Sequence, residues 1–476
     1  MRDLSKYLNK KIFQVTAEAA SEMGRPVYVI GGWVRDLVMG RPSKDIDIVV
    51  AGNGPELASL IAEKLGRKDR LSIFKNFGTA MLTYRGWQVE FVGARKESYR
   101  SNSRKPVVEQ ASLEEDISRR DFTINAMALS INSADFGKLI DPYGGLADID
   151  KKLIRTPLDP LVTYSDDPLR MMRAIRFSTQ LDFDIEEASF EAIKQNSSRI
   201  SIVSTERLMD EFNKIMLCEN PGRGIKMLRS TGLLRHFFPE LDALHGVEVV
   251  NGNAHKDNFF HTVQVLDKLS AKTDNLWLRW AALLHDIAKP LTKKFVEGTG
   301  WTFHGHEHKG SRMVEKIFRR LRLPSNEKMK YVQKLVLLHL RPIALTESGV
   351  SDSAVRRLLF EAGDDIDDLM MLCEADITSG NRAKVDRYLE NFALVRQKLR
   401  ETEENDRLRN WQPPVSGDDI MEAFAVPPCR EVGIIKAAIR EAILDGEIPN
   451  QRQEALKRMY QEGEKLGFRP ANTNIS

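Results

Sequence analysis

The sequence contains few cysteines and no long hydrophobic run. Its three cysteines, Cys218, Cys373 and Cys429, are far apart and odd in number, without metal-ligand spacing, so we expect reduced structural residues. Apolar runs such as Leu335–Leu338 are far shorter than the roughly 20 residues of a membrane helix. The charged opening, MRDLSKYLNKK, has no signal-peptide core. These absences predict a cytoplasmic protein with no membrane partner.

A strong excess of one charge is also missing. The net charge is +3 and the pI is about 8.5, which neither demands nor excludes a polyanionic partner. No internal repeat appears at solenoid periods. With 476 residues, of which 42% are hydrophobic, the chain has enough apolar material for two to four domains.

The hydrophobic pattern changes its period along the chain. Before residue 150 it predicts an α/β region; after Asp150, apolar residues recur three and four apart, which predicts helices over most of the remainder. Residues 94–110 are basic and polar, so we expect a mobile loop there. The predicted elements of the first region are a helix over 1–24, strands over 27–30, 45–50, 79–84 and 87–92, and a further apolar segment over Ile124–Ile131.

The basic residues of this predicted loop offer cations for phosphate groups, although a solvated surface loop is the commoner use of such a charge run. They are Arg95, Lys96, Arg100, Arg104 and Lys105.

Two aspartates interrupt the strand DIDIVV. Side chains at i and i+2 of a strand face the same way, so Asp45 and Asp47 share one side while Ile46 and Ile48 face the other. Aspartate is disfavoured in strands, and one reading is an acidic sheet edge that discourages aggregation. The other is a site where the carboxylates bind two magnesium ions, which in turn hold a triphosphate. The pattern alone leaves both open.

The neighbouring residues favour the metal site. Gly31 and Gly32 end a predicted strand, where backbone amides can approach a phosphate, although a tight turn is the commoner use of such a pair. Glu90, in WQVEFV, becomes a third inward acid if its strand lies beside DIDIVV; otherwise it pairs with a basic residue across the sheet.

Four motifs, in order between residues 31 and 217, resemble the class II tRNA nucleotidyltransferases (CCA-adding enzymes) and the related bacterial poly(A) polymerases, within the polymerase-β-like superfamily. They are GGWVRDLVMGRPSKDID at 31–47, RRDFTINAMA at 119–128, DDPLRMMRAIRF at 166–177 and TERLMDEFNKIML at 205–217. The resemblance implies that Asp45, Asp47 and Glu90 are catalytic and that Asp45 and Asp47 hold Mg2+. It implies that nucleotides are bound by Gly31, Gly32, Arg35, Arg120, Asp121, Asn125, Asp167, Arg170, Arg173 and Arg176.

In that family the DDPLR element selects CTP or ATP without a nucleic-acid template. We expect Asp167 and Arg170, three apart on a helix, to meet one base edge; a surface ion pair is the alternative. Asp166 stands where the family usually has Glu. The chain lacks the GRRF-like element of poly(A) polymerases, and its 94–115 segment resembles the loop that complete CCA-adding enzymes keep. Complete CCA addition is therefore favoured over CC-adding, A-adding and poly(A)-polymerase activity.

Seven of the nine histidines fall between His255 and His339. Adjacent His and Asp in the apolar LLHDIAK are costly to bury without a ligand. The order of histidines and aspartates along this region, H…HD…H…H…D, resembles an HD phosphohydrolase domain. The resemblance implies a site for a divalent transition metal. The predicted ligands are His261, His285, Asp286, His306, His339 and Asp376.

These observations predict a fold and a function. We expect an α/β nucleotidyltransferase head with a small mixed sheet, followed by an all-α neck, an HD domain and a helical tail that holds tRNA. The expected partners are tRNA, CTP and ATP, and no protein partner is evident. Two other hypotheses stay open: an HD phosphohydrolase with a degenerate head, and a noncatalytic RNA-binding protein. The predicted boundaries are 1–150, 151–250, 251–390 and 391–476.

Overall fold

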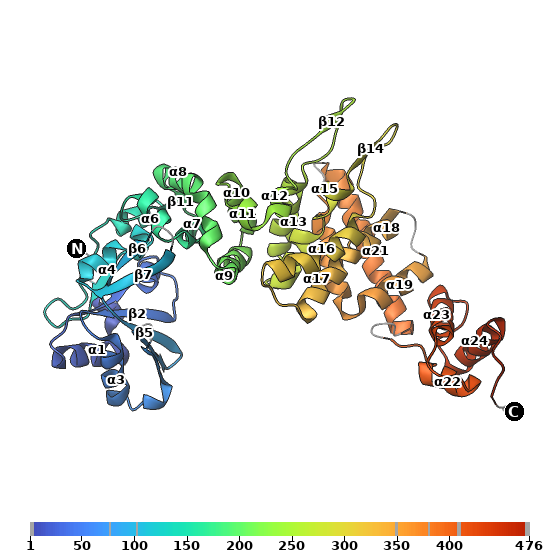
Figure 1. Ribbon diagram of the computed structural model, residues 1–476, viewed down its shortest axis with the longest axis horizontal. Helices are drawn as coiled ribbons and strands as arrows, with labels where there is room; N and C mark the ends of the chain where they lie inside the picture. Colours follow the sequence, from blue (N-terminus) through green and yellow to red (C-terminus); the bar gives the residue numbers. More distant parts are fainter. Residues whose placement is uncertain are drawn as a thin grey trace. The chain divides into compact units, whose positions relative to one another are not determined.

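The computed structural model divides into two compact units, Met1–Asp242 and Ala243–Ser476 (Figure 1). Each unit has its own core and is described by itself. The residues that the structure describes are 4–75, 78–100, 103–347, 351–378, 381–406 and 411–471.

A mixed seven-stranded sheet forms the centre of the first unit, in the order β3-β4-β5-β2-β1-β8-β9. The predicted strands over 27–30, 45–50, 79–84 and 87–92 are all present. The strands are β1 (Val27–Ile30), β2 (Asp45–Val50), β3 (Leu71–Phe74), β4 (Thr79–Tyr84), β5 (Trp87–Gly93), β8 (Ala128–Ser130) and β9 (Leu139–Ile140).

The register of the sheet brings the acidic residues together. Strand β2 runs parallel to β5 and antiparallel to β1, and Asp47 stands beside Glu90 on one side and Ile30 on the other. The alternation expected for β2 is present. Ile46 and Ile48 lie in the larger of two apolar cores on either side of the sheet, whereas the opposite face carries the aspartates.

Helices cover the face of the sheet that carries the larger core. Buried residues of α1 and α3 belong to that core, and α3 begins where Asn53 accepts a hydrogen bond from the Glu56 amide, with Pro55 in the first turn. The predicted helix over 1–24 is shorter than expected, since α1 follows a separate 3-10 turn, η1 (Ser5–Leu8). The head helices are α1 (Lys11–Glu22), α2 (Gly32–Val38), α3 (Gly54–Lys64), α4 (Leu113–Ser118) and α5 (Gly145–Asp150), with 3-10 turns η2 (Lys68–Arg70) and η4 (Thr123–Asn125).

The prediction of a loop over 94–110 is wrong. The backbone forms two antiparallel strands, β6 (Arg95–Arg100) and β7 (Ser103–Gln110), which pair with each other apart from the larger sheet. That prediction rested only on how little apolar side-chain surface this segment can bury. A hairpin satisfies its backbone groups by its own pairing, so a polar segment can still form strands.

Helices make up most of the rest of the first unit, as the sequence predicts. A short parallel pair, β10 (Leu153–Ile154) with β11 (Asp184–Ile185), is the exception within the described residues. The helices are α6 (Pro160–Asp166), α7 (Leu169–Leu181), α8 (Glu187–Asn196), α9 (Thr205–Met216), α10 (Pro221–Ser230), α11 (Leu234–Phe237) and α12 (Pro239–Asp242), with the 3-10 turn η5 (Ser197–Ile202).

In its described residues, the second unit is helical apart from two short hairpins. These are β12 (Val249–Val250) with β13 (Asn253–Ala254), and β14 (Lys294–Val296) with β15 (Gly300–Thr302). The helices up to the long α21 are α13 (Asn258–Ser270), α14 (Leu276–Leu284), α15 (Lys289–Thr292), α16 (His306–Arg320), α17 (Glu327–Leu338), α18 (Arg341–Glu347), α19 (Asp352–Ala362), α20 (Ile366–Asp376) and α21 (Arg382–Asp406), with η6 (Gly363–Asp365) before α20.

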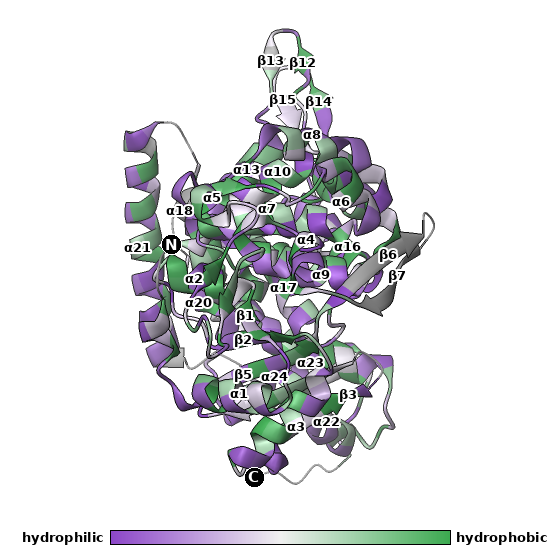
Figure 2. Ribbon diagram, turned by 90° about the vertical axis from the view of Figure 1, so that its left-hand side faces the viewer, coloured by the Kyte–Doolittle hydropathy of each residue, from purple (hydrophilic) through white to green (hydrophobic). Residues whose placement is uncertain are grey.

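A small separate core lies near the end of the chain. It joins α22 (Gly417–Phe424), α23 (Arg430–Asp445) and α24 (Arg452–Lys465). Hydrophilic residues dominate α21, which precedes them (Figure 2). Among the residues that the structure describes, no helix combines the length and apolar character that crossing a membrane requires.

Candidate active site and metal centre

A sharp turn links β1 to α2 at the edge of a cleft. Gly31 has φ +80°, a left-handed conformation that favours glycine. A Cβ atom there would lie 2.9 Å from Arg120 Nη1 and 3.3 Å from Asp47 Oδ2. Glycine therefore lets a carboxylate and a guanidinium approach the backbone of this turn.

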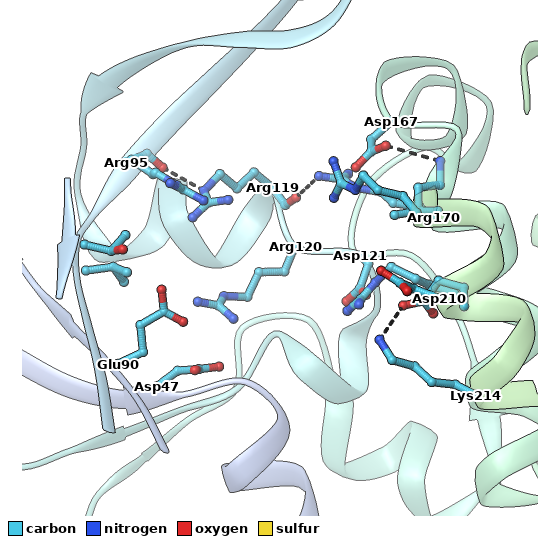
Figure 3. Close-up of a pocket in the computed structure, with 16 residues that line it drawn as sticks. Asp47, Glu90, Arg95, Arg119, Arg120, Asp121, Asp167, Arg170, Asp210 and Lys214 are labelled. Carbon is cyan, nitrogen blue, oxygen red and sulfur yellow. Dashed lines mark hydrogen bonds and ion pairs between the residues drawn. The ribbon is translucent and has the colours of Figure 1, made fainter. Parts of the chain in front are cut away.

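The cleft itself has a volume of about 650 Å3 and opens on the face of the sheet that carries Asp47 and Glu90 (Figure 3). Burial raises the pKa of Asp47, and Asp45 adds to the effect, while Arg120 opposes it. Burial and the charge of Asp47 likewise raise the pKa of Glu90. Two neighbouring carboxylates that disfavour each other's charge provide the hard oxygen ligands that suit a divalent cation such as Mg2+.

A buried carboxylate holds the two arginines of the RRD motif. Asp116 is 0% exposed and accepts hydrogen bonds from Arg119 Nη2 at 2.5 Å, from Arg120 Nη2 at 3.2 Å and from the Arg95 amide at 3.3 Å. Burial acts to raise the pKa of Asp116, but the two arginines lower it overall. Arg120 then points toward Asp47 and Glu90 (Figure 3).

A second buried carboxylate joins the RRD motif to α7. Asp121 accepts hydrogen bonds from Arg173 Nε at 2.7 Å, from Asn125 Nδ2 at 3.1 Å and from the Phe122 amide at 2.9 Å. Burial acts to raise its pKa, but Arg173 and Asn125 lower it to about 2. Asn125 Oδ1 in turn accepts from Arg35 Nη1 at 2.8 Å. This network fixes the orientation of Arg173 at the wall of the cleft.

Asp167 and Arg170 both line the cleft. The prediction that both lie on one helix is wrong for Asp167. It is extended, with φ −128° and ψ 94°, in the break between α6 and α7. Pro168 explains the difference, because a residue before proline is disfavoured in the helical conformation. The Asp167 carboxylate accepts from the Leu169 amide at 3.2 Å, and Arg170 Nη2 donates to the Arg119 carbonyl at 2.7 Å.

One face of α9 completes the cleft and was not predicted as part of the site. Arg207, Asp210, Glu211 and Lys214 all line it. Glu211 accepts from Arg176 Nε at 2.5 Å and from Lys214 Nζ at 3.1 Å. The four residues follow an i, i+3, i+4, i+7 spacing, which places them on one helix face. That polar stripe was a signal available in the sequence.

Some predicted head residues line the cleft and others do not. Those that line it are Asp47, Glu90, Arg120, Asp121, Asp167, Arg170 and Arg173, joined by the unpredicted Thr79, Val92, Arg119 and Leu169, and by Arg95 from the predicted basic loop. Those outside the lining are the exposed Asp45, the turn residues Gly31 and Gly32, and the buried Arg35, Asn125 and Arg176.

The predicted metal ligands meet in the second unit. Asp286 lies at the centre: its Oδ1 is 3.2 Å from His306 Nε2, and its Oδ2 is 3.2 Å from His285 Nε2 and 3.4 Å from His261 Nε2. Two groups of potential ligands share Asp286, and the ligand atoms within each group lie within 4.8 Å of one another. These groups are His261, His285 and Asp286, and Asp286, His306 and His339. Asp376 Oδ1 lies 2.8 Å from His261 Nε2.

The imidazole rings are oriented as ligands. The Nδ1 atoms of His285, His306 and His339 lie 2.8, 2.8 and 2.7 Å from the carbonyl oxygen three residues earlier in the chain. An Nδ1–H that donates to such a carbonyl leaves the Nε2 lone pair facing the cluster. Burial lowers the pKa of His339 to about 4, which keeps that ring neutral. The residues therefore fit a divalent transition metal.

A cavity of about 580 Å3 opens onto this cluster. Lys256, Lys289 and Phe303 line it together with His261 and Asp376. Lys289 Nζ lies 2.6 Å from Asp286 Oδ2, and Lys256 Nζ lies 3.1 Å from His261 Nδ1. Two lysines and an aromatic ring beside a metal-type cluster suit an anionic substrate.

Three family models match this chain in succession. Residues 27–155 match the poly A polymerase head domain, residues 182–244 match the probable RNA and SrmB-binding site of polymerase A, and residues 258–380 match the HD domain.

Individual relatives extend the match. The A-adding tRNA nucleotidyltransferase of Deinococcus radiodurans is 32% identical over 362 residues, covering 74% of this chain and 80% of that protein. The multifunctional CCA protein of Pseudomonas paraeruginosa is 32% identical over 351 residues, covering 70% and 80%. A crystal structure of a tRNA nucleotidyltransferase with primer tRNA and an incoming ATP analogue aligns with TM-score 0.56 and 25% identity, over 80% of this chain and 99% of that one. The chain belongs to the class II tRNA nucleotidyltransferase and poly(A) polymerase family and carries an HD domain.

Proposed function

We propose that the cleft of the first unit completes the CCA end of tRNA from CTP and ATP, without a nucleic-acid template. One observation carries the proposal: the carboxylates Asp47 and Glu90 and the polar pair Asp167 and Arg170 line the same cleft. A group that can hold reacting phosphates and a group that can hold a base are thus in one site. The A-adding and multifunctional CCA relatives support the choice of tRNA as acceptor.

The carboxylates form the proposed catalytic centre. Asp45, Asp47 and Glu90 would hold Mg2+, which when bound neutralises phosphate charge and promotes attack by the 3′ hydroxyl. Arg120, held by Asp116 and directed at the carboxylates, is placed to donate to a phosphate or a ribose oxygen. Because its guanidinium is already fixed, little rearrangement is needed when charge develops.

The opposite wall forms the proposed nucleotide-selecting site. Cytosine and adenine each offer an amino donor next to a ring-nitrogen acceptor, so a carboxylate and a guanidinium can pair with either base. Asp167 supplies the acceptor and Arg170 the donor. The hydrogen bond from Arg170 to the Arg119 carbonyl ties this wall to the RRD motif. Arg173, fixed by Asp121, adds a third oriented donor.

Incubation with tRNA tests the proposal. Pure protein receives Mg2+ and tRNA ending before CCA, or ending in CC, with labelled CTP or ATP alone or together. Complete CCA addition predicts incorporation of two C residues from CTP alone, and of A only after both are present. Failure on every tRNA would contradict the assignment and favour an HD hydrolase or a noncatalytic RNA-binding protein.

A-adding activity is the second candidate for the same cleft. The Deinococcus radiodurans relative, with 80% of its length matched, favours it. In that case the protein extends only tRNA that already ends in CC. A long adenosine tail on the same substrate would instead indicate a poly(A) polymerase.

The cluster around Asp286 supports a proposed hydrolytic activity. Its imidazole and carboxylate donors fit a transition metal, which when bound supplies a nucleophilic water for phosphate esters. Lys256 and Lys289 would hold the anionic substrate in the adjoining cavity. Metal analysis, followed by assays with p-nitrophenyl phosphate and a 2′,3′-cyclic nucleotide, tests this activity separately from nucleotide addition.

The four-part division at 1–150, 151–250, 251–390 and 391–476 also remains a proposal, with the last part holding the tRNA body through phosphates and shape.

A further inference from the structure

A second pocket of the first unit lies away from the proposed catalytic cleft. It has a volume of about 500 Å3, and its lining comes from η1, the two residues between η1 and α1, α2, the loop before β2 and the start of β5. The residues that line it are Lys6, Tyr7, Asn9, Lys10, Trp33, Leu37, Arg41, Pro42, Ser43 and Trp87.

The pocket opens on the opposite side of the sheet from the cleft. Side chains alternate along β5, so Trp87 packs with the larger core while Glu90 faces the cleft. Both residues lie on the same strand, three positions apart, which is about 10 Å of extended chain. The two sites are therefore separate but share a strand of the sheet.

The charge of this pocket is positive and not neutralised. Lys6, Lys10 and Arg41 line it, and none of its lining residues is acidic. All three cations are exposed, and none has an ion pair with any residue in the described part of the chain. Lys10 Nζ lies 3.7 Å from the centre of the Trp87 ring. An aromatic ring, not a carboxylate, holds this cation, so its N–H donors stay available for an anion.

The pocket also contains aromatic rings. Trp33 is 6% exposed and packs on Phe13, so it forms the floor, whereas Tyr7 is 41% exposed. A half-open ring among unpaired cations suits a ligand that combines a flat aromatic group with negative charge. Nucleotides are such ligands, since a base can stack on the ring while its phosphates meet the lysines.

We propose that this pocket binds a nucleotide unit of single-stranded RNA, with Tyr7 stacking on a base and Lys6, Lys10 and Arg41 holding adjacent phosphates. Charge complementarity favours a polyanion over an apolar partner. Exposed cations continue beyond the pocket at Lys11 and Lys44, which favours a polymer over a free mononucleotide because successive phosphates can be met along a path. Binding here does not depend on transfer chemistry in the cleft.

Fluorescence anisotropy with a labelled ten-nucleotide single-stranded RNA and the full chain tests this site. Lys6→Glu/Lys10→Glu should weaken binding at least ten-fold. Losing two phosphate contacts should also reduce the slope of log affinity against log salt by about 1.4. Tyr7→Ala should weaken binding by about five-fold or more, the range expected for one stacked base, while Tyr7→Phe should retain it.

The control reverses two positive charges elsewhere on this unit, one of which, Lys68, lies 3.1 Å from the exposed Glu63. Arg67 and Lys68 are exposed and follow α3, whose C-terminal end is tied to the C-terminal end of α1 by the pair Lys64 and Glu22. That end lies one helix length, about 18 Å, from Lys10. Arg67→Glu/Lys68→Glu should therefore change affinity less than two-fold.

Crosslinking identifies the site independently of affinity. RNA containing 4-thiouridine should crosslink to peptides that include Tyr7 or Trp87, as mapped by mass spectrometry. The proposal is overturned if the pocket and control variants bind alike, if Tyr7→Ala binds normally, or if these peptides carry no crosslink. Competition by AMP as effective as that by the oligonucleotide would overturn the assignment to a polymer. If the wild-type chain binds this RNA as expected but adds no nucleotide to tRNA, that result counts against the proposed function alone.

Discussion

Replacing Asp121 with asparagine should destabilise the first unit and impair nucleotide binding together. The carboxylate is 8% exposed and lies 2.6 Å from Arg173 Nη2, which holds that arginine at the cleft wall. Asparagine keeps an oxygen for the hydrogen bonds from Asn125 and the Phe122 amide but removes the charge. Arg173 then loses its ionic partner and is free to turn away from the cleft.

The pKa of Asp121 sets the expected magnitude. A value lowered from 3.8 to about 2 corresponds to about 2 to 3 kcal/mol of stability that depends on the charged form. Because the folded pKa is depressed, this contribution is complete above about pH 4 and is lost as the pH falls toward 2. Arg173 is one-third exposed and can regain water, so the loss should fall below the 3 to 5 kcal/mol typical of breaking a buried pair.

The stability of this unit is measured by urea unfolding of the full chain, with hydrogen exchange of the α7 amides as the readout. Asp121→Asn should lose about 2 kcal/mol at pH 7, and the difference from the wild type should shrink below pH 4. Its KM for CTP and ATP should rise. Asp150→Asn, at an exposed head carboxylate, is the control and should match the wild type. A pH-independent difference, or an unchanged KM with the stability loss present, would refute the positioning role of the carboxylate.

Three further predictions address the separate sites. Asp47→Ala should abolish incorporation of labelled CTP and ATP yet leave tRNA affinity largely intact, because metal clamping acts on the transition state; near-normal turnover would contradict the catalytic assignment. Asp167→Ala and Arg170→Ala should blur the CTP-to-ATP preference more than they weaken triphosphate binding, and unchanged discrimination in both would indicate a structural role. His285→Ala should remove a transition metal detected by elemental analysis while nucleotide addition continues. Metal retention would place that site elsewhere.

Local patterns in the sequence predicted the sheet and its acidic face. Alternation along DIDIVV was enough to place Asp47 opposite Ile46 and Ile48, because side-chain direction in a strand depends only on position. The parallel pairing of β2 with β5, which sets Glu90 beside Asp47, was only a condition of the prediction. The pairing of two distant strands cannot be predicted from the sequence of either strand alone.

The direction of helical side chains near a junction was harder to predict. Arg170, Arg173 and Arg176 follow one another on α7, but six residues are about a third of a turn away from a whole number of turns. Arg176 therefore faces Glu211 and is buried, while Arg170 lines the cleft. The family motif marked all three arginines alike, and only the packing of α9 against α7 separates their environments.

Each of the two centres is assembled within one unit. The cleft takes its walls from β2, β5, α7, α9 and the RRD segment, all before Ala243. The ligands around Asp286 come from α13, α16, α20 and the C-terminal ends of α14 and α17, all after Asp242. Because the described residues that form each centre all lie in one unit, His285→Ala removes no side chain that lines the cleft. We therefore expect any effect of His285→Ala on nucleotide addition to come from lost stability of the second unit, which can be measured apart from catalysis.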